Sequence, residues 1–386
     1  MLSTIMLPRT LRVGGGSVSG LGDLLISGGL RKPLLVTDSF MVSTGAAEKA
    51  LASLTAAGLE PRLFAGSIPD PTTNSLAAGV LAAREHGSDS VIGFGGGSPM
   101  DTAKAIALLV AQGGDMRDYK APRVNAGPAL PIIAVPTTAG TGSEATQFTI
   151  ITDSETDEKM LCLGPVFLPA AAIIDYELTL SMPPRLTADT GIDALTHAIE
   201  AYVSRRANSF SDLLAIKAIN SIAGSLERAY HDGQDRPARE AMMFASTQAG
   251  IAFSNSSVAL VHGMARPLGA HFHVAHGMSI AMLLPAVTAL SIDSAPKRYA
   301  DCARALNCAV DSDSDKLAAD KLVAHLKTLT TDLAVPTPSS YGLDENQWKE
   351  LTPLMAQQAI DSGSPANNPL VPGPSQIAEL FHEIYV

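Results

Sequence analysis

The first half of the chain alternates short apolar runs with alanine- and leucine-rich stretches, and this alternation limits the folds that are open to it. The stretches 45–58 and 73–87 have the length and composition of helices. Strands that alternate with such helices predict βαβ units and a mostly parallel sheet. The runs predicted as strands are 32–38, 60–66, 89–97, 130–138 and 170–178.

The pattern changes near Ser181, where the sequence "SMPPRLTAD" breaks the chain with two prolines. Helical periodicity then dominates from about residue 187 to the end, and β-branched runs are few. We therefore predict an α/β domain with a Rossmann-like parallel sheet over residues 1–180. An all-α helical domain over residues 181–386 should follow it.

Composition excludes several classes of protein. With 46% hydrophobic and 17% charged residues in 386, the chain suits a large globular core rather than disorder. A net charge of −11 argues against broad binding to nucleic acid or to an anionic membrane. Three cysteines are too few for a disulfide framework. Neither a signal peptide nor a long apolar run is recognisable, so we expect a cytoplasmic protein without a membrane span.

A glycine-rich turn joins the third predicted strand to a helix in "VIGFGGGSPMDTAKA". We expect Ser98 to cap this helix, Pro99 to occupy its first position, and Asp101 to lie three residues after the cap. Free N–H groups and the positive end of the helix dipole would then form an anion site, which suits a dinucleotide pyrophosphate. A tight turn without a ligand is the alternative. The turn residues assigned to the cofactor are Gly95, Gly96, Gly97, Ser98 and Asp101.

Two further segments follow predicted strands. Asp38 ends the first strand, where a carboxylate can accept from an adenosine ribose hydroxyl and repel a 2′-phosphate, which favours NAD(H) over NADP(H). A plain turn aspartate is the alternative. The sequence "VPTTAGTGSEAT" places hydroxyls and small residues at the end of another strand, which suits a ligand crevice or a polar loop. Its candidate residues are Thr137, Thr138, Thr141 and Ser143.

Histidines are concentrated in the helical half. Asp193 and His197 are four residues apart in "GIDALTHAIEAY", so they share a helix face. His262 and His276 are separated by fourteen residues, and we expect Pro267 and Gly269 to bend the chain between them. The four side chains together suit Fe(II) or Zn(II). A surface Asp–His pair and scattered structural histidines are the competing interpretations.

Four ordered motifs make nearly the whole chain resemble the iron-containing (group III) alcohol dehydrogenases. The resemblance implies an active site in a cleft between an N-terminal dinucleotide-binding domain and a C-terminal helical domain. It implies metal ligation by Asp193, His197, His262 and His276, with NAD(H) on the glycine turn, Asp38 and the threonine segment. It also places Asp70 near the adenine. The motifs are "GGGSPMDTAKA", "VPTTAGTGSEAT", "GIDALTHAIEAY" and "HGMARPLGAHFHVAHG".

One position departs from the family pattern. Many members have a histidine four residues after the third ligand, often assigned to proton relay, and this chain has Arg266. A guanidinium stays protonated and cannot act as a neutral base. It could instead hold an anionic group of the substrate, or pair with an acid such as Glu144. Lys159 is a weaker candidate for the same anion-binding role.

The function implied is hydride transfer between NAD(H) and an alcohol, aldehyde or ketone, with a divalent metal, most readily Fe(II), as Lewis acid. The alternative is a lyase of the dehydroquinate synthase type, which uses a metal and NAD only transiently. A nucleotide-binding protein without catalysis is a third class. Beyond the substrate, we expect a homodimer or higher homo-oligomer.

Overall fold

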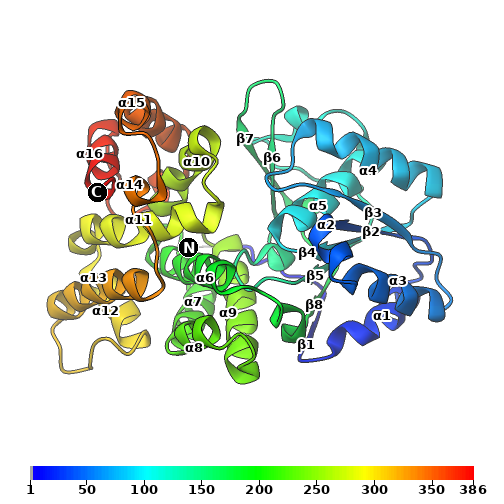
Figure 1. Cartoon of the computed structure of the whole chain (residues 1–386), viewed down its shortest axis with the longest axis horizontal. Helices are drawn as coiled ribbons and strands as arrows, with labels where there is room; N and C mark the ends of the chain where they lie inside the picture. Colours follow the sequence, from blue (N-terminus) through cyan, green and yellow to red (C-terminus); the bar gives the residue numbers. More distant parts are fainter. Residues whose placement is uncertain (1–2) are drawn as a thin grey trace. The chain divides into compact units, whose positions relative to one another are not determined.

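The structure is a computed structural model that describes residues 3–386. The chain divides into two compact units, Thr4–Ser181 and Met182–Val386. The first is an α/β unit and the second is helical, as the sequence predicts (Figure 1). All three cysteines are unpaired.

The α/β unit is built on a six-stranded parallel sheet with the order β1-β8-β5-β4-β2-β3. All five predicted strands are present, and the structure adds a first strand and a separate antiparallel hairpin of β6 and β7. The strands are β1 (Thr10–Val13), β2 (Pro33–Asp38), β3 (Arg62–Ser67), β4 (Ser90–Gly95), β5 (Ile132–Pro136), β6 (Phe148–Thr152), β7 (Lys159–Leu163) and β8 (Ala171–Ile174). Its helices are α1 (Leu21–Ser27), α2 (Ser39–Ser43), α3 (Ala46–Ala56), α4 (Thr73–His86) and α5 (Gly97–Gln112), and its 3₁₀ turns are η1 (Ser17–Gly20), η2 (Met116–Tyr119), η3 (Ser143–Ala145), η4 (Pro165–Phe167) and η5 (Tyr176–Thr179).

Helices cover both faces of this sheet, and β2 shows why its sequence is continuously apolar. Leu35 packs into a core cluster with residues of α1 and α3. Its neighbours Leu34 and Val36 point to the opposite face and pack with residues of α4 and α5. A strand that is buried on both faces needs apolar residues at every position rather than alternate ones.

The strand order places a topological switch point between β2 and β4. The chain passes from β2 to β3 on one side, then returns to β4 on the other side of β2. Connections that leave two neighbouring parallel strands in opposite directions open a crevice at their carboxyl ends, which is where ligands bind in such sheets. Asp38 ends β2 and Gly95 ends β4, so both predicted cofactor elements lie at this switch point.

A second glycine-rich run, Gly14 to Gly16, follows β1 but serves a different purpose. Asp175, at the end of β8, accepts hydrogen bonds from the N–H groups of Gly16 and Val18, each at 3.0 Å. The chain's own buried carboxylate therefore occupies the donors that a bound anion would need.

The helical unit contains eleven further α-helices and two 3₁₀ turns among the described residues. The longest is α6, and α9, α7 and α11 pack against it. The helices are α6 (Pro184–Val203), α7 (Ser209–Ile222), α8 (Ser225–His231), α9 (Arg236–Ser254), α10 (Leu260–Phe272), α11 (His276–Ser291), α12 (Pro296–Ala305), α13 (Asp315–Asp332), α14 (Pro338–Tyr341), α15 (Glu345–Asp361) and α16 (Pro374–Ile384), of which α14 is a single turn, and the 3₁₀ turns are η6 (Ile292–Ser294) and η7 (Ser364–Asn367).

One segment, His276–Ser294, is long and apolar enough to cross a membrane by length and composition. It comprises α11 and the 3₁₀ turn after it, and 61% of its apolar window is buried inside the fold. Its contacts with α6, α10 and α13 are those of a core helix.

Lys104 of α5 is fully buried, which is unusual for a lysine. Its Nζ donates to the carbonyl and hydroxyl oxygens of Thr146, both at 3.1 Å, and to the carbonyl oxygen of Phe148 at 2.7 Å. These bonds hold the segment after β5 against α5. Burial, opposed by Asp101 and Glu144, lowers the pKa of Lys104 to about 8.

This pKa predicts the pH dependence of stability. Between pH 8 and about pH 10 the unfolded chain keeps a proton on Lys104 that the folded chain has released, so the contribution of Lys104 to stability rises with pH. The free energy of unfolding of the wild type, measured relative to Lys104→Met by urea denaturation, should rise by about 2 kcal/mol over this range. A constant difference would contradict the assignment.

Candidate metal centre and cofactor-binding turn

Three helices carry the predicted metal ligands. Asp193 and His197 lie one turn apart on α6, His262 lies in the first turn of α10, and His276 begins α11. The segment between α10 and α11 reverses the chain, and α11 packs against both α10 and α6. Residues that are distant in sequence are thereby brought together.

The structure gathers Asp193, His262 and His276 into one compact group. One ligand atom from each lies within 4.8 Å of the others. Oδ1 of Asp193 is 3.4 Å from Nε2 of His262 and 3.8 Å from Nε2 of His276. The Asp193 and His262 side chains are buried, whereas the His276 side chain is 42% exposed. A carboxylate and two imidazoles in this arrangement are a donor set for a divalent ion.

Two atoms in this group test whether a metal fits. Asp193 Oδ1 and His262 Nε2 are both buried, and neither has a hydrogen-bond partner among the described residues. Buried polar atoms are nearly always satisfied, and one ligand-binding group placed between these two atoms would satisfy both. A divalent cation accepts both as ligands, and the residues present therefore fit a metal.

His197 is close to this group but not part of it. Its Nδ1 is 3.8 Å from Asp193 Oδ1. Its ring stacks between those of Phe253 and His262, with centroid distances of 4.3 and 4.4 Å. The predicted role of His197 as a fourth ligand stays a prediction.

The charges of the group are strongly coupled. Burial favours a neutral Asp193, but the three neighbouring histidines outweigh this and lower the pKa of Asp193 to about 2. Burial likewise disfavours a charged His262, but Glu200 and Asp193 raise the pKa of His262 to about 9. The site thus keeps a carboxylate ionised in a buried position, which suits a cation.

Glu200 is a residue of this site that the sequence analysis missed. It lies on α6, seven residues after Asp193, and is buried. Its Oε2 is 2.6 Å from Nδ1 of His262. The sequence contained a signal, because Asp193, His197 and Glu200 follow the i, i+4, i+7 spacing of one helix face.

The predicted bend at Pro267 and Gly269 is wrong. α10 continues through both residues to Phe272, and the chain turns at His273, which has a φ of 55°. A residue in the left-handed region is a common helix terminator, and here it separates the last turn of α10 from His276. No glycine or asparagine stands at that position to indicate the turn.

Arg266 lies one turn after His262 on α10 and is partly buried. Its Nη1 is 3.4 Å from the carbonyl oxygen of Ser362, a long hydrogen bond. No carboxylate of residues 3–386 forms an ion pair with Arg266 within 4.0 Å. Burial lowers the pKa of Arg266, and the nearby charge of Glu200 opposes this effect. His271, near the end of the same helix, has its Nε2 2.7 Å from Oε1 of Gln358.

The start of the helix after the glycine turn of the α/β unit differs from the prediction. α5 begins at Gly97, its N-cap is Gly96, and no side chain caps it. Ser98 is therefore not the cap, and Pro99 is the third helical residue rather than the first. The first N–H groups of the helix, including those of Gly97 and Ser98, are therefore not used by a capping side chain. The positive end of a 16-residue helix, which is only partly buried at Gly97 and Ser98, is suited to binding an anion.

The threonine segment faces this turn. A Cβ on Gly96 would lie 3.4 Å from Thr138, and one on Gly97 would lie 3.0 Å from Thr141. Gly95 has a φ of 150°, and a Cβ there would collide with Pro99 at 2.6 Å and lie 3.6 Å from Oδ2 of Asp38. The turn, Asp38 and the threonines thus lie close together, and their predicted role in binding the cofactor stays a prediction.

The remaining predicted cofactor residues bind other parts of the chain. Asp101 does not form a capping box: its Oδ1 accepts from Ser143 Oγ and its Oδ2 from the Ile150 N–H, each at 3.1 Å. Burial raises the pKa of Asp101 to about 6, against the opposing effect of Lys104. Thr137 is buried and its N–H donates to the Gly95 carbonyl at 2.9 Å. These three residues shape the turn.

Asp38 and Asp70 also have partners in the chain. Asp38 caps α2 by accepting from the Met41 N–H at 2.9 Å through Oδ1. Asp70 has a φ of 49°, a conformation that Asp and Asn tolerate better than most residues. Its carboxylate pairs with Lys159 at 3.0 Å, so the two sequence candidates are partners of each other.

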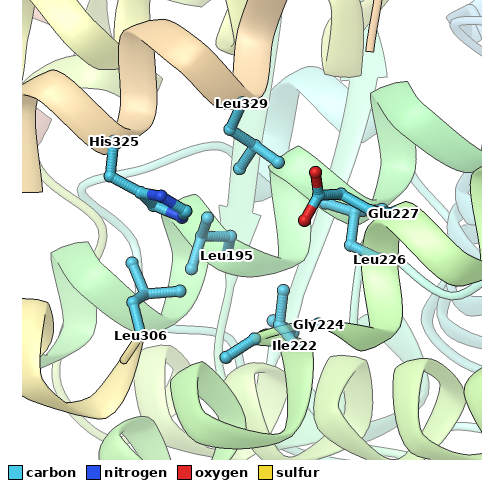
Figure 2. Close-up of a pocket in the computed structure, with 9 residues that line it drawn as sticks. Leu195, Ile222, Gly224, Leu226, Glu227, Leu306, His325 and Leu329 are labelled. Atoms are coloured by element: carbon cyan, nitrogen blue, oxygen red, sulfur yellow. The ribbon is translucent and has the colours of Figure 1, made fainter. Parts of the chain in front are cut away.

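A separate small cavity lies on the opposite face of α6 from the metal ligands. Figure 2 shows that Leu195, Leu306 and Leu329 line it together with His325 and Glu227. Leu195 is two residues from Asp193 and therefore points away from it. Asp193, His262 and His276 do not line this cavity, so it is not the candidate metal centre.

Comparison with known proteins identifies the family to which the chain belongs. The family model for iron-containing alcohol dehydrogenases matches residues 8–176, and that for the C-terminal domain of the same family matches residues 187–385. The lactaldehyde reductase of Escherichia coli K12 is 38% identical over 99% of both chains.

Two solved structures extend this agreement to the fold. A 1,3-propanediol oxidoreductase has a TM-score of 0.96 at 34% identity, over 100% of both chains. A sulfoacetaldehyde reductase from Bifidobacterium kashiwanohense, solved in complex with NAD+, has a TM-score of 0.89 at 28% identity, over 100% of this chain and 99% of the other. The chain therefore belongs to the iron-containing alcohol dehydrogenase family and is an oxidoreductase of alcohols and aldehydes.

Gly277, which follows His276, provides a test of how the centre is built. A Cβ at this position would lie 2.6 Å from the backbone carbonyl oxygen of Asp189 on α6. We predict that Gly277→Ala displaces His276 and weakens Zn(II) binding by about tenfold, measured by competition with a chelator.

Alanine favours a helix by about 1 kcal/mol over glycine, so weaker Zn(II) binding by Gly277→Ala would not come from a less stable α11. Gly373→Ala is the matched control, since Gly373 has ordinary φ and no atom within 4 Å of the added Cβ. Equal Zn(II) affinity in wild type and Gly277→Ala would show that this close approach does not position His276.

Proposed function

We propose that the chain catalyses reversible hydride transfer between NAD(H) and an alcohol or aldehyde, with Fe(II) as the resident metal. The observation that carries the proposal is the pair of unsatisfied buried atoms, Asp193 Oδ1 and His262 Nε2, beside His276. The family name and the NAD+ bound to the sulfoacetaldehyde reductase support the metal and the cofactor.

The helical unit would bind the metal, and the α/β unit would bind the cofactor. Asp193, His262 and His276 would hold the metal, with His197 as a further ligand. A divalent ion, when bound, supplies Lewis-acid chemistry to the substrate oxygen. The N–H groups at the start of α5 would bind the pyrophosphate of the cofactor, which carries the hydride. Asp38 would accept from the ribose hydroxyls and repel a 2′-phosphate, which favours NADH over NADPH.

Metal removal and reconstitution test this function. Protein stripped by a chelator should lose reduction of aldehydes and regain it with Fe(II) or, to a lesser extent, Zn(II). NADH should be consumed one for one with aldehyde, and more efficiently than NADPH. Turnover with no net change in NADH would favour the lyase of the dehydroquinate synthase type. NADH binding without turnover by any metal-loaded sample would leave only a nucleotide-binding protein.

The side chain of Arg266 indicates a class of substrate. Arg266 is a partly buried guanidinium one turn from His262, and no carboxylate of the described residues pairs with it. A guanidinium binds carboxylates and sulfonates through two parallel hydrogen bonds and remains charged at neutral pH. We propose that it holds the anionic group of an aldehyde substrate, and that it does not relay protons. The similarity to a sulfoacetaldehyde reductase supports this class of substrate.

Two aldehydes of matched size test the role of Arg266. Sulfoacetaldehyde is anionic, and methylsulfonylacetaldehyde is its neutral counterpart. The wild type should prefer the anionic aldehyde by about tenfold to hundredfold in kcat/KM, and Arg266→Gln should abolish this preference. Arg266→Lys should retain part of it. Equal efficiency with both aldehydes, unchanged in Arg266→Gln, would contradict the proposal.

A further inference from the structure

We propose that Glu200 is a positioning residue of the metal centre: it fixes the ring orientation and tautomer of His262 and ties α10 to α6. The inference rests on the proposed metal-dependent function. It concerns a residue that makes no contact with the substrate or the ligand atoms of the metal.

The two oxygens of Glu200 receive three hydrogen bonds from one short segment. Oε2 accepts from the Ala259 N–H at 2.7 Å and lies 2.6 Å from His262 Nδ1. Oε1 accepts from the Val261 N–H at 2.7 Å. An ionised carboxylate can only accept, so Nδ1 must be the donor in this pair. In a neutral imidazole the lone pair then lies on Nε2, the atom that faces Asp193 at 3.4 Å.

Glu200 also replaces a local helix cap. The N-cap of α10 is Ala259, which offers no side-chain hydrogen bond. The carboxylate that satisfies the first turn comes instead from α6, 59 residues earlier. Because α6 carries Asp193 and α10 carries His262, one side chain fixes both the orientation of a ligand and the distance between two ligand-bearing helices.

A purely structural cap would not need this placement. α15 is capped locally by Asp344, whose side chain accepts from the Gln347 N–H at 2.8 Å. Glu200, by contrast, is 3% exposed. A buried carboxylate is costly unless it is fully hydrogen-bonded, and a neutral side chain could cap a helix without that cost. The use of a charged, acceptor-only group fits the requirement for a single histidine tautomer.

The experiment measures Zn(II) affinity by chelator competition, together with the absorption of the Co(II)-loaded protein. Glu200→Gln keeps the size of the side chain but offers a single acceptor atom and an NH₂ donor, which can reverse the tautomer of His262. We expect its Zn(II) affinity to fall by tenfold to a hundredfold and its Co(II) spectrum to change. Glu200→Asp keeps the charge on a shorter side chain, and its Zn(II) affinity should lie between those of the wild type and Glu200→Gln.

A double-mutant cycle separates positioning from capping. In the His262→Ala background, Glu200→Gln should no longer change Zn(II) affinity, although it should still lower the thermal stability of the metal-free protein. Asp344→Ala is the matched control: it removes a cap in the same helical unit and should lower stability without changing Zn(II) affinity.

The outcomes are distinguishable. If the wild type does not bind Zn(II) tightly, the proposed function fails. If the wild type binds and Glu200→Gln binds equally well with the same Co(II) spectrum, the positioning role is overturned and Glu200 is only a cap. The same conclusion follows if Glu200→Gln weakens Zn(II) binding by an equal factor in the His262→Ala background. Should Glu200→Gln fail to fold, Glu200→Asp carries the comparison.

Discussion

The carboxylate of Asp193 is buried among imidazoles, and this burial governs the chemistry of the helical unit. A carboxylate with 2% of its side chain exposed is tolerated only beside positive charge or hydrogen-bond donors, and one of its oxygens has no hydrogen-bond partner among the described residues. His262 and His276 face that oxygen from two other helices. The close contact of Gly277 with α6 and the hydrogen bonds of Glu200 hold those helices in place. The fold therefore concentrates negative charge and imidazole nitrogen where a divalent cation would satisfy both.

The α/β unit contains a different kind of candidate site, one suited to an anion, and this site is built mainly from backbone groups. The turn after β4 leaves the start of α5 without a capping side chain, and glycines keep Cβ atoms away from Thr138 and Thr141. Side chains that the sequence suggested for this purpose, such as Asp101, instead hold the surrounding loop. The contrast with the turn after β1, where Asp175 occupies the N–H groups, shows that glycine content alone does not make an anion site.

The sequence predicted the elements whose signals are local. Apolar runs identified the five central strands, and the i, i+4 spacing of Asp193 and His197 placed them on one helix face. It missed β1 and the β6–β7 hairpin, because short strands with alternating burial resemble ordinary loops. It also misplaced the turn before His276, since a non-glycine residue adopts the left-handed conformation there. The pairing of Lys159 with Asp70 and of Glu200 with His262 depends on tertiary contacts that no local pattern encodes.

We expect Asp193, His262 and His276 to bind one divalent ion. The most direct measurement is anomalous X-ray diffraction from crystals of the Zn(II)-loaded protein at the zinc edge. One anomalous peak should lie at about 2.0–2.2 Å from an oxygen of Asp193 and from Nε2 of both histidines. A peak bound elsewhere in the chain, or full Zn(II) loading with these three side chains uncoordinated, would contradict it.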